Sequence, residues 1–268
     1  MKSNGIYITG DIHGEFLPLM FIINQREKLK NCSVIVAGDI GMGFYKPGYY
    51  LDTFKDMEKR LSKNNIQLYL VRGNHDNPFY FNVTPDNLKN FPHVHLVHDY
   101  EVLHIDNHNI LCVGGASSVD KIYRIAGETW WEGENIIPYD KLVCKNIDVV
   151  ITHCAPMFCP PKYERISWMD DELDEKSRAD RVLLGKLYFD LLKKSKPKYW
   201  FYGHYHAHHV SELSNKEESF SDIDKSLLLG GHTIVSIDPD ELVEDKNTCK
   251  FIGLDMLIYN SWDKYKLE

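Results

Sequence analysis

Five short runs of β-branched and aromatic residues are each followed at once by a turn that carries Asp, Asn or His, and this repeat constrains the fold more than any other feature. The runs have the length of buried strands and occupy residues 6–9, 33–37, 67–71, 148–151 and 198–202. The polar turns are 10–14, 38–39, 73–76, 152–153 and 203–206. Each turn follows a strand's C-terminal end, the place where open α/β sheets bind ligands.

The side chains in these turns are of the types that bind metal ions. The two-residue offset between Asp11 and His13 sends both to the same side of an extended backbone, so the pair can close on one cation. A mixture of carboxylate, amide oxygen and imidazole suits Mn²⁺ best, with Fe, Zn, Co and Ni as alternatives, whereas Mg²⁺ and Ca²⁺ prefer oxygen alone. Two such ions can activate a bridging water, or hydroxide, as a nucleophile for hydrolysis. The inventory therefore predicts a two-metal hydrolase.

The order of the motifs resembles that of the calcineurin-like metallophosphoesterase superfamily, in which GDxHG, GD, GNH(E/D), a lone His and GHxH follow one another. Here they extend from Gly10 to His206, about three quarters of the chain. The resemblance implies a dinuclear centre bridged by Asp39. It assigns one metal to Asp11, His13 and His206. It assigns the other to Asn74, His153 and His204.

The same resemblance suggests catalytic roles beside the metals. His75 would act as the general acid for the leaving oxygen. Arg72 stands before Gly73 as in the RGNH form of the phosphoprotein-phosphatase branch, where the arginine binds phosphate through its planar fork. That branch reads GDxVDRG in its second motif, but residues 38–43 read GDIGMG, so an orienting Asp and a further Arg are missing. Asp76 or water is expected to orient His75, and efficient phosphoprotein dephosphorylation is disfavoured.

A second informative stretch is the segment 114–134, which follows a strand-like run at 109–113 and should also open on the metal face. Arg124 is a candidate phosphate ligand, and Trp130 or Trp131 could stack a base. In the alternative interpretation, both tryptophans pack the loop onto the body and Arg124 pairs with Asp120. We favour the packing role for the tryptophans, and both roles stay open for Arg124.

Hydrophobic patterns indicate an α/β (α+β) chain. Helices are expected at 15–29, 49–63, 139–145 and 176–194, and further strands at 93–97, 101–105, 110–113, 233–237 and 250–257, with surface loops at 214–226 and 239–247. This order fits the four-layer αββα sandwich that the resemblance implies, in which two mixed β-sheets are flanked by helices. The proposed ligands lie between residues 11 and 206 and must meet in one place, so residues 1–268 are expected to form a single domain.

Composition limits the partners. The net charge of −8 disfavours extended nucleic-acid binding, although a metal-lined site could take a short nucleotide or nucleic-acid end. No apolar run approaches the roughly 20 residues that span a membrane. Six cysteines without a CxxC pair, and an N-terminus that enters a strand directly, favour the cytoplasm.

The sequence therefore predicts a metal-dependent phosphoric ester hydrolase acting on a phosphate ester, with a phosphomonoester as the preferred substrate. A phosphodiesterase or nuclease acting on nucleotides or nucleic-acid ends is the first alternative, favoured by the Trp130-Trp131 loop. The second alternative is a non-catalytic scaffold of the same fold. Retention of the whole ligand set argues against a scaffold, because burying so many polar groups without an ion would be costly.

Overall fold

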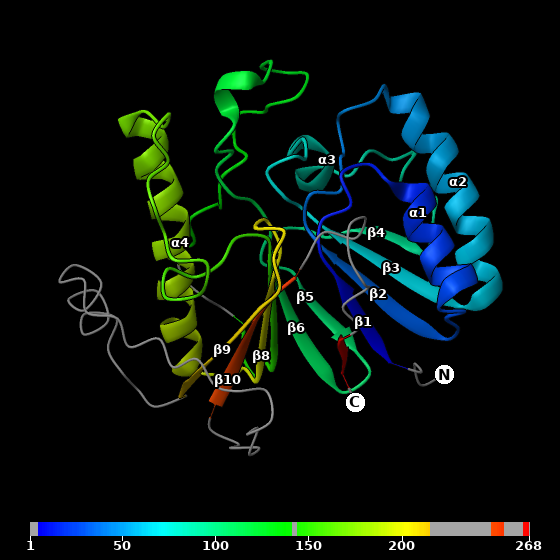
Figure 1. The fold of residues 1–268 in the computed structure, drawn as a ribbon. Helices are drawn as coiled ribbons and strands as arrows, with labels where there is room; N and C mark the ends of the chain where they lie inside the picture. The colour runs from blue at the N-terminus through cyan, green and yellow to red at the C-terminus, as the bar shows by residue number, and fades with distance from the viewer. Residues whose placement is uncertain (1–4, 141–143, 215–247, 255–264, 268) are drawn as a thin grey trace.

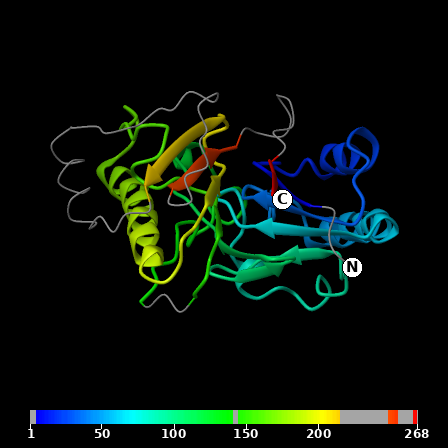
Figure 2. The same ribbon diagram turned by 90° about the horizontal axis from the view of Figure 1, so that it is seen from below.

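The structure is a computed structural model that describes residues 5–140, 144–214, 248–254 and 265–267. Its strands form two sheets (Figures 1 and 2). The first sheet has the order β11 (Tyr265–Leu267), β1 (Ile6–Thr9), β2 (Cys32–Ala37), β3 (Ile66–Val71) and β4 (Val94–Leu96). Strands β1 to β4 run parallel, and β11 pairs antiparallel with β1. The first sheet is therefore mixed.

The second sheet is also mixed. Its order is β5 (Val102–Ile105), β6 (His108–Val113), β7 (Val149–Thr152), β8 (Tyr199–Tyr202), β10 (Thr248–Gly253) and β9 (His209–Ser214). Strands β6, β7, β8 and β10 are parallel, whereas β5 and β9 pair antiparallel at the two edges. All five strands expected before the polar turns are thus present as parallel strands, three in the first sheet and two in the second.

Helices cover the outer face of each sheet (Figure 2). The first sheet carries α1 (Phe16–Phe21), a π-helical turn (Ile22–Arg26) and α2 (Pro47–Asn64), and the second carries α4 (Asp171–Leu192). Two short helices, α3 (Phe79–Asn82) and the 3₁₀ turn η2 (Lys121–Tyr123), lie in loops. A third apolar cluster joins the facing sides of the sheets, with Ile8 and Ile35 from one sheet and Ile151 and Phe201 from the other. This helix–sheet–sheet–helix arrangement confirms the αββα sandwich.

Local sequence explains where the long helices begin and end. Pro47 occupies the first position of α2, where its missing N–H costs no hydrogen bond, and Asn65 ends the helix with a left-handed φ of 51°. At the start of α4, the Asp170 side chain accepts a hydrogen bond from the Leu173 N–H at 2.8 Å. Acidic residues in the first turn of α4 interact favourably with the positive end of the helix dipole.

Some expected elements differ from the structure. The described residues of the 139–145 stretch are not helical. Tyr139 instead anchors this stretch to α4, where its hydroxyl donates to Asp190 at 2.8 Å and its ring packs against Lys186. The helix expected at 15–29 divides into α1 and the π-helical turn, and β9 and β11 were not predicted. The expected strand 233–237, the end of 250–257 and nearly all of both expected surface loops lie outside the described residues.

No helix in the described part of the chain is long and apolar enough to cross a bilayer. All six cysteines are free thiols, and all except Cys144 are buried. Burial raises the pKa of the Cys32 thiol to about 12. These thiols therefore behave as small core side chains, without a role in cross-linking the fold.

Replacement of a core leucine tests the packing of α4 on the second sheet. Leu187 is fully buried in this cluster, so Leu187→Ala should lower the free energy of unfolding by about 2–5 kcal/mol, the cost of lost burial plus a cavity. Leu183 is only partly buried on the same helix, and Leu183→Ala serves as the matched control with a smaller loss. Urea denaturation measures both values, and equal losses would contradict the described orientation of α4.

Candidate metal centre

The polar turns of both sheets meet at one edge, beyond the C-terminal ends of their parallel strands. Three turns follow β1, β2 and β3 of the first sheet, and two follow β7 and β8 of the second. Two groups of possible metal ligands result, each with ligand atoms within 4.8 Å of one another. The first group is Asp11, His13, Asp39 and His206, and the second is Asp39, His153 and His204.

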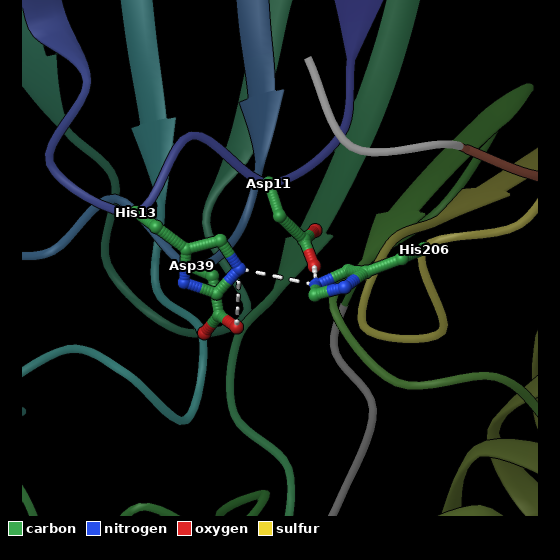
Figure 3. Close-up of side chains that lie close together, drawn as sticks. All are labelled: Asp11, His13, Asp39 and His206. Atoms are coloured by element: carbon green, nitrogen blue, oxygen red, sulfur yellow. Dashed lines mark hydrogen bonds and ion pairs between the residues drawn. The ribbon is translucent and has the colours of Figure 1, made fainter. Parts of the chain in front are cut away.

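The first group draws residues nearly 200 positions apart into contact (Figure 3). His206 Nε2 lies 2.9 Å from Asp11 Oδ2 and 3.0 Å from His13 Nε2. His13 Nε2 in turn lies 3.8 Å from Asp39 Oδ2. Two imidazole nitrogens and two carboxylate oxygens therefore converge on one small volume.

The second group lies on the other side of Asp39. His153 Nε2 lies 3.1 Å from Asp39 Oδ1 and 2.9 Å from Asn74 Oδ1, and the ring of His204 packs against that of His153. Asp39 thus presents Oδ1 to the second group and Oδ2 to the first. A carboxylate with its two oxygens divided in this way has the geometry of a bridging ligand.

The electrostatics of the cluster fit a bound cation. Asp11 and Asp39 are each only 1% exposed, and among the described residues their ion-pair partners are histidines. Burial lowers the pKa of His153, but Asp39 and Asp11 oppose this effect and raise the pKa to about 9. The two buried carboxylates thus favour positive charge at His153. A divalent cation would supply this positive charge in place of the proton.

Backbone conformation also marks these turns. His13, Asp39, His204 and His206 all have positive φ, at 45°, 48°, 70° and 49°. Residues other than glycine rarely adopt this region, and each instance costs of order 1–3 kcal/mol. Four such residues in one cluster indicate that the surrounding structure holds them where their side chains converge.

Two glycines allow the turns to approach one another. A Cβ atom at Gly38 would lie 2.0 Å from His153 Nδ1, and one at Gly73 would lie 2.1 Å from Asp39 Oδ1. Gly38 also has a φ of 100°, which side-chain-bearing residues rarely adopt. Glycine before Asp39 and before Asn74 is thus required by packing against the proposed ligands.

His75 lies beside Asp39 at the edge of the cluster. Its backbone N–H donates to Asp39 Oδ1 at 2.8 Å, and its ring Nε2 lies 3.8 Å from Asp39 Oδ2. Burial, aided by the charge of Arg124, lowers the pKa of His75 to about 4 against the opposing effect of Asp39. Nε2 of the neutral ring therefore accepts from Arg124 Nη2.

Arg124 pairs with Asp120, as one interpretation of its role expected, and the phosphate contact of the other interpretation stays a prediction. Its side chain is only 6% exposed, pairs with Asp120 at 2.7 Å and contacts His75 through the same nitrogen, Nη2. Nη1 donates to the Thr129 carbonyl at 3.3 Å. The structure thus places Arg124 beside His75, at the rim of the cluster, while Asp120 holds it there.

Arg72 does not reach the cluster. Its guanidinium is fully buried and donates to the carboxylate of Asp99 at 2.9 Å and to carbonyls of the 114–135 segment. The acceptors in that segment are the carbonyls of Gly114, Gly133, Glu134 and Asn135. The expected phosphate contact has no support in this geometry, because the fork already serves backbone oxygens away from any incoming phosphate. Arg72 instead ties the segment to the turn that carries Asn74.

Asp76 also serves the backbone. Its carboxylate accepts from the N–H groups of Ile40, Gly41, Met42 and Gly73 at 2.7–3.0 Å. Burial and the nearby Asp39 raise the pKa of Asp76 to about 6, against the lowering effect of those N–H groups. With both oxygens so occupied, the expected orienting role toward the His75 ring has no support. Asp76 instead joins the turn after β2 to the turn after β3.

Both tryptophans contact other side chains of the protein, as the packing interpretation predicted. Trp131 is buried and stacks on Phe44 with ring centroids 5.7 Å apart. The ring of Trp130 lies under the ammonium group of Lys121 at 4.3 Å. Trp131 therefore has no free face for stacking a base, whereas Trp130 is half-buried and Lys121 covers one of its faces.

Two residues beside the cluster were missed by sequence reasoning. Ser118 and Glu134 are buried, and Ser118 Oγ lies 3.0 Å from Asn74 Nδ2. The position of Ser118 just beyond the glycines that follow β6 was the available signal. Glu134 carried no signal, because its contact with Ser118 depends on the folding of the whole segment.

The chain is similar to a known protein family and to solved structures. A family model described as calcineurin-like phosphoesterase matches residues 5–208. A crystal structure with 12% identity has a TM-score of 0.43 and covers 76% of this chain and 85% of its own. A structure of a protein serine/threonine phosphatase from Saccharomyces cerevisiae, with similarity to human phosphatase PP5, has 14% identity and a TM-score of 0.32, covering 94% of this chain and 80% of its own. No curated protein matches the chain in sequence.

The family model spans most of the chain and includes all five polar turns. The side chains of those turns form the His and Asp cluster described above. This chain therefore belongs to the calcineurin-like phosphoesterase family, as a metallophosphoesterase with a divalent-metal site typical of that family.

Proposed function

We propose that this protein is a phosphomonoesterase with a two-ion centre in a single domain. Asp11, His13 and His206 would hold one ion, and Asn74, His153 and His204 the other, with Asp39 as the bridge. The observation that carries the proposal is the division of the Asp39 carboxylate between the two groups. Because both sheets supply ligands to one cluster, neither sheet could form the site alone, which supports one domain over residues 1–268.

The donor set favours Mn²⁺ over Mg²⁺ or Ca²⁺, since four of the proposed ligands are imidazoles. Fe, Zn, Co and Ni share this preference and are alternatives. When bound, the two cations supply Lewis acidity and neutralise charge on the phosphoryl oxygens. The remaining chemistry falls to side chains around them.

Arg124 and His75 are the side chains that substrate would meet. A phosphate entering the centre would compete with His75 for the Arg124 guanidinium, because a charged, forked contact is stronger than one to a neutral imidazole. Once Arg124 turns to the phosphate, Nε2 of His75, whose side chain is 23% exposed, is free to take up a proton from solvent and donate it to the leaving oxygen. The contact between Arg124 and His75 supports this exchange.

A phosphodiesterase acting on nucleotides or nucleic-acid ends is the second candidate. The feature that favours it is Tyr123, which is 76% exposed and adjacent to Arg124. A free aromatic face next to a phosphate ligand could stack a base. The buried Trp131 does not contribute to this candidate.

Free thiols support the proposal of a cytoplasmic location. All six cysteines are unpaired, including five in the core. A reducing compartment keeps such thiols in this state. Counting free thiols in the purified protein would not identify the compartment. The location is therefore tested by imaging a tagged chain in its own cell.

A substrate panel tests the function. The metal-depleted protein is reconstituted with Mn²⁺ and assayed with p-nitrophenyl phosphate and bis-p-nitrophenyl phosphate. A higher kcat/KM for the monoester supports the phosphomonoesterase, and a higher value for the diester supports the second candidate. Absence of turnover with either ester, at two bound ions, would favour the non-catalytic scaffold.

Asp39→Asn should nearly abolish hydrolysis and weaken both metal sites. The amide has only one oxygen and no charge, so it bridges poorly and no longer balances two cations. Elemental analysis of the purified variant measures metal content, and an esterase assay measures turnover. Two tightly bound ions with normal turnover would contradict the bridging role.

His75→Asn should leave metal content largely intact and lower kcat by about 10²–10⁴-fold, the range of general acid catalysis. The loss should be larger for alkyl phosphates than for p-nitrophenyl phosphate, because a poor leaving group needs the proton more. His95→Asn is the matched control, since that ring pairs with Gln67 away from the cluster. An equal loss for both leaving groups would indicate a structural role for His75.

Arg124→Ala should lower kcat/KM by about one to two orders of magnitude, the scale of losing roughly 1.5–3 kcal/mol from a charged hydrogen bond. Inhibition by inorganic phosphate should weaken in parallel, and metal content should not change. Arg178→Ala removes an exposed arginine of α4 that pairs with Asp174 and serves as the control. Unaltered kcat/KM with a lower melting temperature would show that Arg124 only braces Asp120.

A further inference from the structure

A buried chain of hydrogen bonds leads from the 114–135 segment to Asn74. Glu134 Oε2 accepts from Ser118 Oγ at 2.5 Å, and Glu134 Oε1 accepts from the Ser118 N–H at 2.9 Å. Ser118 Oγ accepts from Asn74 Nδ2 at 3.0 Å. The three residues are at most 2% exposed, so their polar groups have little access to solvent and depend on one another.

We propose that Ser118 and Glu134 are positioning residues that fix the amide of Asn74 and thereby set the affinity of the group formed by Asp39, Asn74, His153 and His204 for its ion. The inference rests on the proposed role of Asn74 as a ligand in that group. It adds two residues outside the five polar turns to the parts that determine metal binding.

Proton accounting gives the reason. A serine hydroxyl has one proton to donate, and Ser118 gives it to the carboxylate of Glu134. The oxygen of Ser118 can then only accept from Asn74, so Nδ2 must face Ser118. Oδ1 of Asn74 consequently faces His153 at 2.9 Å, on the side where the ion would bind.

Without this chain the amide would lose its preferred orientation. The oxygen and nitrogen ends of an asparagine side chain have nearly the same shape, so packing alone distinguishes them poorly. The reversed orientation would point N–H groups at the ion and remove one oxygen ligand. Removing the Ser118 hydroxyl should therefore weaken binding of the ion at this group and leave binding of the other ion unchanged.

The segment that carries the chain is itself held by buried charges. Arg72 donates to the Glu134 carbonyl at 2.8 Å and lies two residues before Asn74. Asp180 of α4 accepts from the Ile136 N–H at 3.1 Å and from Asn135 Nδ2 at 2.9 Å. These bonds fix Ser118 relative to Asn74, which makes the orientation a property of the fold.

The test is calorimetric titration of the metal-depleted full chain with Mn²⁺. Ser118→Ala should raise the Kd of one of the two ions by about 10–100-fold, as for other residues that orient a ligand, and leave the other Kd unchanged. Glu134→Gln should weaken binding of the same ion, since an amide supplies one acceptor oxygen where the carboxylate supplies two. The readout is binding, so it does not depend on turnover.

Ser117→Ala is the matched control. It removes a hydroxyl from the adjacent buried residue, whose partners are Asp180 and Asn135 and not Asn74. Thermal unfolding is measured alongside, so that a general loss of stability in either alanine variant is separated from an effect on the ion. Both Kd values of Ser117→Ala should match those of the wild type.

The outcomes separate this inference from the proposed function. If the wild type binds two ions and Ser118→Ala has the same two Kd values, the positioning role is wrong and the two-ion centre stands. If the wild type binds fewer than two ions, the two-ion centre is wrong, and the positioning role falls with it. Equal weakening in Ser117→Ala and Ser118→Ala would also overturn the inference, because it would reflect loosening of the whole segment.

Discussion

The buried carboxylate of Asp39 is the constraint on which the arrangement of the site depends. Turns from three other strands converge on it: the His75 N–H donates to it, His153 contacts one oxygen and His13 faces the other. Gly73 packs so closely that a Cβ atom would overlap the carboxylate. A charge buried to this extent is stable only when it is compensated, so both sheets must present positive or cation-binding groups at the same edge.

Other buried charged side chains near the site form hydrogen bonds with backbone groups of the surrounding loops. Arg72 spreads its donors over carbonyls of the 114–135 segment, and Asp76 gathers N–H groups from the turns after β2 and β3. Loops that lack regular pairing leave such backbone groups unsatisfied, and burying them unpaired would be costly. The two side chains therefore let irregular turns pack tightly beside Asp39.

The sequence predicted features that depend on short stretches and missed those that depend on distant contacts. The five strands and the convergence of their polar turns followed from local pattern, as did the packing of Trp131. The phosphate role of Arg72 was expected from its resemblance to a related motif, whereas its partners are Asp99 and carbonyls of the 114–135 segment, outside that motif. The orienting role of Asp76 was expected because the Asp of the related motif is missing, whereas its partners are backbone N–H groups of the turns after β2 and β3. The antiparallel edge strand β9 pairs with β10, and Tyr139 is anchored to α4; no local window contains both partners of either contact.

The 114–135 segment contacts both Asn74 and His75. Its base is fixed by Arg72, Asp180 and the bond between Glu134 and Ser118, whereas residues 122, 123 and 125 near its tip are exposed. Figure 1 shows this segment, in bright green at the top, standing clear of the two sheets. The fixed base contacts Asn74, and the tip carries Arg124 to His75. Under the proposed function, the hydrogen-bonded base would keep the orientation of Asn74 constant while the exposed tip meets the substrate.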